Sequence, residues 1–211
     1  MPTRAELKQY AKQCMQEQSL NPIVFTLVYT LIAIAISLLS AILGVTVLIP
    51  MILSIISSVL QVNYTYYCMK VARREQGEYT DLAYGFHDIK YTLKLFALVF
   101  AIGIFTSLWS LLFIIPGVIK ALEYSQAVMI LIENPEKEIM EVIRESQKMM
   151  NGHKMEYFIL SFSFFFWNLL SSLTLGIASL WVMPYMNITF VHYYYALKQQ
   201  TKTTQKVILE Y

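Results

Sequence analysis

The lysine and arginine side chains of this sequence are sorted into four islands along the chain. Of the 16 such residues, all but Lys120 fall within residues 4–12, 70–94, 137–154 or 198–206. The long stretches between these islands are apolar and almost free of charge. Because membrane proteins keep lysine and arginine in their cytoplasmic loops, the pattern predicts a polytopic, all-α membrane protein with its N- and C-termini in the cytoplasm.

The composition makes the lipid bilayer the expected solvent for much of this chain. Hydrophobic residues make up 57% of the 211 residues and charged residues only 14%, whereas soluble domains carry about 25% charged residues. The net charge of +2 gives no reason to expect nucleic acid as a partner. Residues 1–21 are too polar for a cleavable signal peptide, so we expect the first spanning helix to act as an uncleaved anchor.

The apolar stretches come in three pairs, and we expect each pair to form a transmembrane hairpin within one membrane domain. The hairpins and the Gly or Pro residues at their turns are 23–68 with Gly44, 96–132 with Pro116 and Gly117, and 157–195 with Gly176. A helix needs about 20 residues to cross the hydrocarbon layer. Together the pairs predict six spanning helices, although the shorter stretch 118–132 leaves open a tilted or partly submerged helix.

Three cytoplasmic segments precede the hairpins, and residues 196–211 form a cytoplasmic tail. The segments are 1–21, 69–95 and 133–156. In the first segment, apolar residues recur at helical spacing from Leu7 to Cys14. This predicts an amphipathic helix that lies on the inner leaflet or, alternatively, docks on a partner protein. Asn134 and Pro135 predict the start of the amphipathic helix in the third segment.

Prolines and asparagines mark further positions in the hairpins. Pro50, Pro116 and Pro184 each lie early in the second helix of a hairpin. Because proline removes a backbone donor, these positions predict three bends. Asn168 and Asn187, both in the third hairpin, are candidates for hydrogen bonds between helices.

Lys120 and Glu123 are charged residues inside an apolar stretch, which makes them the candidate polar site. Charges within the membrane are costly and therefore often functional. Their spacing puts both on one helix face, where they can pair near the outer end of the fourth span. The alternative is that Lys120 reaches the outer interface and Glu123 only neutralises it.

The sequence contains no motif that is typical of catalysis or metal binding. HExxH, a P-loop, G-x-S-x-G and CxxC are all absent, and we expect no enzyme, cofactor or metal. The favoured function is a non-enzymatic membrane module that binds lipid or a partner protein, with a membrane-protein partner or a homo-oligomer both open. One alternative is a small transporter or channel that uses Lys120 and Glu123. The other is an intramembrane enzyme built from these residues, Ser125 or His192.

Several short motifs resemble a known family. They are Leu112-Phe113-Ile114-Ile115-Pro116-Gly117-Val118-Ile119-Lys120, Tyr124-Ser125-Gln126-Ala127, Glu133-Asn134-Pro135, Gly152-His153-Lys154, Leu180-Trp181, Pro184-Tyr185 and, upstream, Tyr79-Thr80-Asp81-Leu82. They resemble the bacterial integral-membrane family catalogued as domain of unknown function 975, over nearly the whole chain. Phe166 and Ala178 depart from it, because the family commonly has Gly there. The resemblance implies a protein of the bacterial cell membrane and implies no activity.

Overall fold

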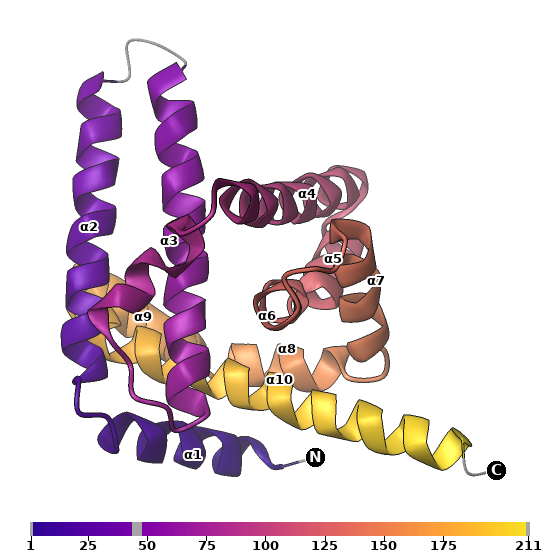
Figure 1. Cartoon of the computed structure of the whole chain (residues 1–211). Coiled ribbons are helices and arrows are strands. Elements are labelled where there is room, and N and C mark those ends of the chain that lie inside the picture. The colour runs from indigo at the N-terminus through magenta and orange to yellow at the C-terminus, as the bar shows by residue number, and fades with distance from the viewer. Residues whose placement is uncertain (1, 44–47, 210–211) are drawn as a thin grey trace.

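The computed structural model describes residues 2–43 and 48–209, and these residues form helices without any strand (Figure 1). The elements are α1 (Arg4–Gln16), α2 (Pro22–Leu43), α3 (Leu48–Ala72), the 3-10 helix η1 (Tyr79–Phe86), α4 (Ile89–Leu112), α5 (Ile114–Tyr124), α6 (Ala127–Glu133), α7 (Ile139–Met149), α8 (Lys154–Phe162), α9 (Phe165–Leu173) and α10 (Ser179–Leu209). The predicted turn at Gly44 lies outside the described residues. The predicted all-α class is confirmed for the rest.

Helices α2 and α3 form a hairpin whose lower end is held by aromatic and polar contacts. The ring of Phe25 stacks on that of Tyr67, with centroids 3.5 Å apart. Thr26 Oγ1 lies 2.8 Å from the Tyr64 hydroxyl. The far end of the hairpin stands clear of the other helices (Figure 1), and apolar side chains such as Leu38 are exposed there. Such a surface needs an apolar environment to cover it.

The loop after α3 folds back onto that helix through a buried asparagine. Asn63 is fully buried, its Nδ2 donates to the carbonyl of Leu82 and its Oδ1 accepts from the amide of Gly85, both at 2.7 Å. A Cβ atom on Gly85 would lie 2.5 Å from Asn63 Oδ1. Glycine is therefore needed where η1 approaches α3.

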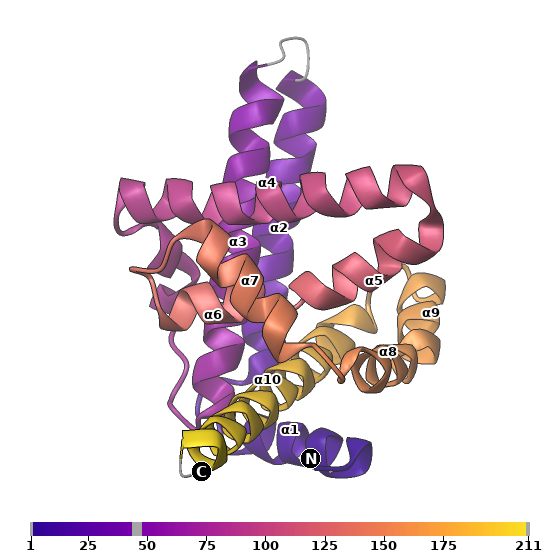
Figure 2. The same cartoon turned by 90° about the vertical axis from the view of Figure 1, so that its right-hand side faces the viewer.

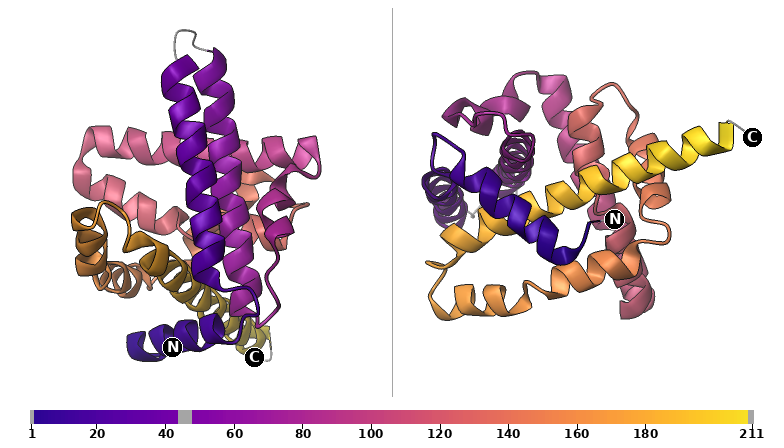
Figure 3. Two further views of the ribbon diagram at one scale, coloured as in Figure 1. Left: turned by 90° about the vertical axis from the view of Figure 1, so that its left-hand side faces the viewer. Right: turned by 90° about the horizontal axis from the view of Figure 1, so that it is seen from below.

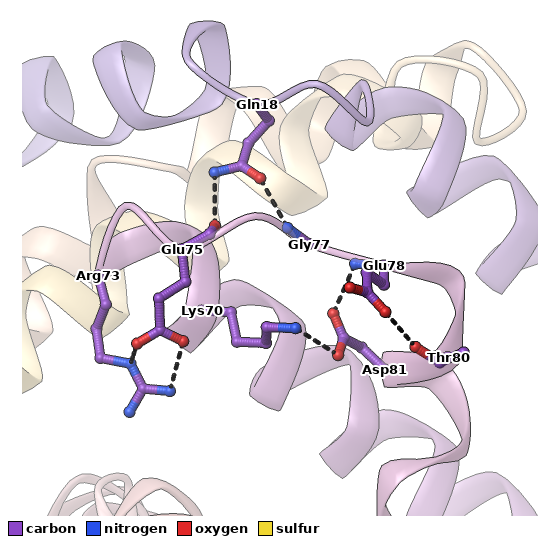
Figure 4. A network of polar contacts seen from close by, with 8 residues as sticks. All are labelled: Gln18, Lys70, Arg73, Glu75, Gly77, Glu78, Thr80 and Asp81. Atoms are coloured by element: carbon purple, nitrogen blue, oxygen red, sulfur yellow. Dashed lines mark hydrogen bonds and ion pairs between the residues drawn. The ribbon is translucent and has the colours of Figure 1, made fainter.

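A polar network fastens the same loop at its other end (Figure 4). Lys70 Nζ lies 2.9 Å from Asp81 Oδ1, and the Glu78 amide donates to Asp81 Oδ2. Gln18 Oε1 accepts from the amide of Gly77 and so joins the α1–α2 connection to this loop. Burial alone would lower the pKa of Lys70, but the hydrogen bond to Asp81 and the negative charge of that carboxylate together outweigh burial and raise the pKa. The segment 69–95 is thus ordered against the protein.

Helices α4 and α5 form a second hairpin, which lies across α2 and α3 (Figures 1 and 2). The chain reverses at Phe113, whose backbone is extended, and the predicted turn at Pro116 and Gly117 is wrong. Both residues lie in the first turn of α5, where a proline costs no helical hydrogen bond. A Cβ atom on Gly117 would meet Ser110 Cα at 2.8 Å. Gly117 therefore permits close contact between α4 and α5.

The third hairpin is less regular than predicted. Its first stretch is interrupted near Ser163 and forms α8 and α9 instead of one long helix. Gly176, with a φ of +89°, lies in the turn before α10, as predicted. Pro184 lies inside α10, at the sixth position, so it removes a helical hydrogen bond. By contrast, Pro116 lies in a first turn and causes no such loss, so the predicted bend there has no basis.

The amphipathic segments bury their apolar faces against the protein itself. Leu7, Ala11 and Cys14 of α1 are buried, and α1 contacts α10 and α3. The prediction that this stripe lies on the inner leaflet is therefore wrong, because the chain's own helices cover it. In residues 133–156 the helix begins at Ile139, while Asn134 caps the end of α6. Here too, buried residues of α7 contact α5 and α6.

Three described stretches are long and apolar enough to cross a membrane. They are Pro22–Ile42, Ile89–Leu111 and Ile114–Glu133, and the last is interrupted between α5 and α6. The first two stretches are largely uncovered, and Leu111 and Ile114 are among the most exposed apolar residues of the described chain. Exposed apolar surface of this kind marks a membrane-facing or partner-facing region.

Candidate functional site

The predicted pair of Lys120 and Glu123 exists, and a third residue joins it. Lys120 Nζ lies 2.6 Å from Glu123 Oε2, and Lys154 Nζ lies 2.6 Å from Glu123 Oε1. The Glu123 side chain is 11% exposed, so both of its oxygens are held by lysines in a largely buried setting. Charge-assisted bonds of this kind are short and strong.

The backbone around Glu123 is fastened to α7. Ser146 Oγ donates to the Glu123 carbonyl at 2.6 Å and accepts from the amide of Gln126 at 3.3 Å. Ser146 and Gln126 are both fully buried. These contacts bridge the break between α5 and α6, so they fix the position of Glu123 relative to α7. Helix α8 follows α7 after a short connection.

Four cationic side chains surround Glu123 at the surface of this site. A cavity of about 360 Å³, which we call the basic pocket, is lined by Lys120, Glu123, Arg144, Gln147, Lys148, Asn151 and Lys154. Among the residues that the structure describes, no hydrogen bond or ion pair engages the side chain of Arg144 or Lys148. One carboxylate faces four cations, so the basic pocket carries an excess of positive charge and suits an anion.

An aromatic ring and apolar residues border the basic pocket. Lys120 Nζ lies 5.4 Å from the centre of the Trp109 ring, which is a cation–π distance. Val118 and Ile119 of α5 are exposed beside it. Tryptophan and lysine side by side are typical of the boundary between hydrocarbon and water.

The contact with Lys154 changes the predicted placement of the pair. The sequence put Lys120 and Glu123 near the outer end of a span and Lys154 in a cytoplasmic segment. Residues in direct contact lie at one level, so these two placements are incompatible. The sequence pattern predicts that α5 belongs to a full membrane span. In the structure, α5 instead packs against α7 and α8.

The other predicted polar residues do not join this site. Asn187 donates to the Met183 carbonyl of its own helix at 2.9 Å, so its predicted interhelical role is wrong. Asn168 Nδ2 lies 4.0 Å from Met186 Sδ of α10, a weak contact between helices. Within the described ranges, no cluster of three or more His, Cys, Asp or Glu side chains could hold a metal ion.

Sequence reasoning missed Arg144 and Lys148 as site residues because it assigned them only to a cytoplasmic island. A signal was present in their spacing. Arg144, Lys148 and Asn151 recur at i, i+4 and i+7, which puts them on one helix face. That face is opposite to the buried Val142 and Ile143, so it was free to line a site.

Comparison with known proteins identifies the family of the chain. A family described as protein of unknown function (DUF975) matches residues 1–123 and 113–201. No curated protein matches the chain, and no solved structure does. The two matched ranges together cover most of the sequence, which confirms the resemblance seen in its motifs. The chain therefore belongs to the DUF975 family of proteins of unknown function.

Proposed function

We propose that this protein is a non-enzymatic module of the bacterial cell membrane that binds an anionic phospholipid in the basic pocket. The observation that carries the proposal is the gathering of Lys120, Arg144, Lys148 and Lys154 around a single carboxylate. Basic pockets beside membrane helices are typical sites for anionic lipid head groups. The exposed apolar residues of α5 next to the pocket would contact the acyl chains.

The role of Glu123 in this proposal is to position two of the cations. By holding Lys120 and Lys154 at 2.6 Å each, its carboxylate offsets the repulsion between their two ammonium groups. Arg144 is the side chain best suited to a phosphate, because its planar guanidinium can donate two parallel hydrogen bonds. Lys148 adds a second free cation one helical turn away.

We further propose that the α4–α5 hairpin enters the membrane without crossing it. From the reversal at Phe113, α5 reaches Glu123 after ten residues, a rise of about 15 Å. The hydrocarbon layer is about 30 Å thick. If Lys154 is cytoplasmic, α5 therefore ends short of the outer face, and α4 need not reach that face either, because the hairpin lies across α2 and α3 (Figure 2). A re-entrant hairpin returns the chain to the side from which it entered. Both termini would then remain on the cytoplasmic side, as the sequence predicts.

Native mass spectrometry tests the lipid proposal. The protein, in a neutral detergent, is offered equal amounts of phosphatidylglycerol and phosphatidylcholine, and bound lipids are counted. We expect the double variant Arg144→Gln/Lys148→Gln to lose one bound phosphatidylglycerol, since each basic residue contributes about 1 kcal/mol to such binding.

A matched variant controls for the change in net charge. Arg4 and Lys90 are exposed and lie outside the basic pocket, so Arg4→Gln/Lys90→Gln removes the same two charges elsewhere. This control is expected to keep the full complement of phosphatidylglycerol. Equal lipid counts in the two double variants would refute the proposal.

A further inference from the structure

A second cavity is lined by residues that are all distinct from those of the basic pocket. It has a volume of about 870 Å³, and residues of α1, α2, α9 and α10 line it. We call it the α1–α10 groove. Viewed from below, α1 crosses α10 (Figure 3), and this crossing borders the groove. Its volume falls within the ~300–1,000 Å³ that is common for ligand sites in proteins.

The lining of the α1–α10 groove is polar along one side and apolar along the other. Lys12 and Gln16 of α1 form part of the polar side, followed by Asn21 before α2. Trp167 and Leu170 of α9 lie on the apolar side. A lining that is divided in this way fits an amphiphile with a polar head and a hydrocarbon chain.

Lys12 gives the polar side a positive charge. Its Nζ lies 5.7 Å from the ring centre of Tyr185, another lining residue. No ion pair engages Lys12 among the residues that the structure describes. One turn earlier, Lys8 Nζ lies 4.4 Å over the ring of Phe164. Lys12 thus supplies a positive charge within the groove, and Lys8 adds a second one on the preceding turn of α1, so an anionic head group would be attracted.

The apolar side exposes two large aromatic surfaces that no described part of the chain covers. Trp167 is 47% exposed and Trp181 is 67% exposed. The neighbouring Leu169 and Leu173 of α9 are also exposed. A hydrocarbon chain in the groove would continue this apolar surface into the surrounding lipid.

We infer that the α1–α10 groove binds one acyl chain of an anionic phospholipid, whose phosphate lies against Lys12. This site shares no lining residue with the basic pocket. It is therefore a second lipid site, and it does not depend on the function proposed above.

The three tryptophans of the chain allow the two sites to be tested separately. Trp167 and Trp181 line the α1–α10 groove, whereas Trp109 lies beside Lys120. The variant Trp109→Phe therefore reports on the groove alone. Its fluorescence is measured in neutral detergent micelles during titration with phosphatidylglycerol that carries brominated acyl chains, and in parallel with brominated phosphatidylcholine.

We expect quenching that saturates at about fivefold lower mole fraction of phosphatidylglycerol than of phosphatidylcholine, as one lysine near the phosphate predicts. Adding Lys12→Gln should remove this difference, whereas Lys90→Gln should keep it. Adding Ala178→Phe, which places a ring in the groove, should abolish the saturable part.

Other outcomes would overturn the inference. Quenching that is linear, or unchanged by both Lys12→Gln and Ala178→Phe, would mean that the tryptophans contact only bulk micelle lipid. Absence of quenching, together with a dimer that Ala178→Phe dissociates, would assign the groove to a second copy of the chain. Loss of saturable quenching in Arg144→Gln/Lys148→Gln would show that the groove is not a separate site.

Discussion

Lys154 Nζ lies 2.6 Å from Glu123 Oε1, an ion pair between residues that are 31 positions apart in the sequence. The contact joins α5 to the start of α8. It engages one carboxylate oxygen of Glu123, and the other oxygen pairs with Lys120. It brings a residue of an apolar stretch into contact with a residue of a basic island. The contact therefore brings two of the four cations of the basic pocket to one carboxylate.

Removal of the charge on Glu123 should destabilise the protein. Glu123→Gln leaves Lys120 and Lys154 close together in a largely buried setting, and we expect a loss of about 2 kcal/mol in the free energy of unfolding. The control is Glu145→Gln, which removes an ion pair with Lys137 that is more exposed than that of Glu123 and should cost less than about 1 kcal/mol. Chemical unfolding in detergent measures both. Equal effects would contradict the structural role of Glu123.

The same variant tests the alternative of a transporter or channel. A conducting role for Glu123 predicts that Glu123→Gln abolishes flux through reconstituted vesicles while the folded protein is retained. The proposed binding module predicts no flux for the unmodified protein either. Flux that is present and sensitive to Glu123→Gln would favour the alternative.

Loss of the Asn63 side chain should loosen η1 from α3. Asn63→Ala leaves the buried Leu82 carbonyl and Gly85 amide without their partners, and we expect a cost of about 2–3 kcal/mol. The exposed Gln61, two residues earlier on α3, provides the control Gln61→Ala, with an expected change within about 0.5 kcal/mol. Hydrogen exchange of the Gly85 amide should accelerate only in Asn63→Ala. Protection that survives in this variant would contradict the assignment.

The re-entrant hairpin can be tested by thiol labelling in intact cells. In a chain whose native cysteines are replaced by alanine, the sequence predicts that Gly44→Cys reacts with a reagent that cannot cross membranes. Phe113→Cys should remain unlabelled if the hairpin is re-entrant as proposed, because such a hairpin does not reach the outer face. Labelling of Phe113→Cys as fast as Gly44→Cys would show that the α4–α5 hairpin crosses the membrane.

The native thiols cannot replace these engineered sites. Cys14 and Cys68 are both buried, so they would escape labelling on either side of the membrane. Burial also raises the pKa of the Cys14 thiol, and a higher pKa leaves less reactive thiolate at neutral pH, by about tenfold for each pKa unit. Labelling of Cys14 in detergent should therefore be slower than that of an exposed Gln13→Cys, and it should accelerate as pH rises above 8. Equal rates at pH 7 would contradict the burial.

The helical class and the pair of Lys120 and Glu123 could be predicted from the sequence, because both depend on short-range periodicity and spacing. Lys120 and Glu123 are three residues apart, so helical geometry alone brings them together. The reversal at Phe113 could not be predicted in this way. It depends on close contact of Gly117 with Ser110, whereas the neighbouring Pro116 suggested a turn and instead lies in the first turn of α5.

The basic pocket itself depends on tertiary contacts that spacing does not encode. Arg144 and Lys148 are indistinguishable in sequence from ordinary cytoplasmic charges. They become site residues because Ser146, between them, fastens α7 to the backbone of Glu123. The amphipathic pattern of α1 had the same ambiguity, since an apolar stripe fits a membrane surface and a protein surface equally well.

The central claim is that the basic pocket binds an anionic phospholipid, and Trp109 gives the most direct measurement of it. In the variant Trp167→Phe/Trp181→Phe, its fluorescence is followed during titration with brominated phosphatidylglycerol or phosphatidylcholine. We expect saturation at a lower mole fraction of phosphatidylglycerol, and roughly thirtyfold weaker binding after Arg144→Gln/Lys148→Gln, from about 1 kcal/mol for each charge. Identical curves for the two lipids in the variant with Arg144 and Lys148 intact would contradict the claim.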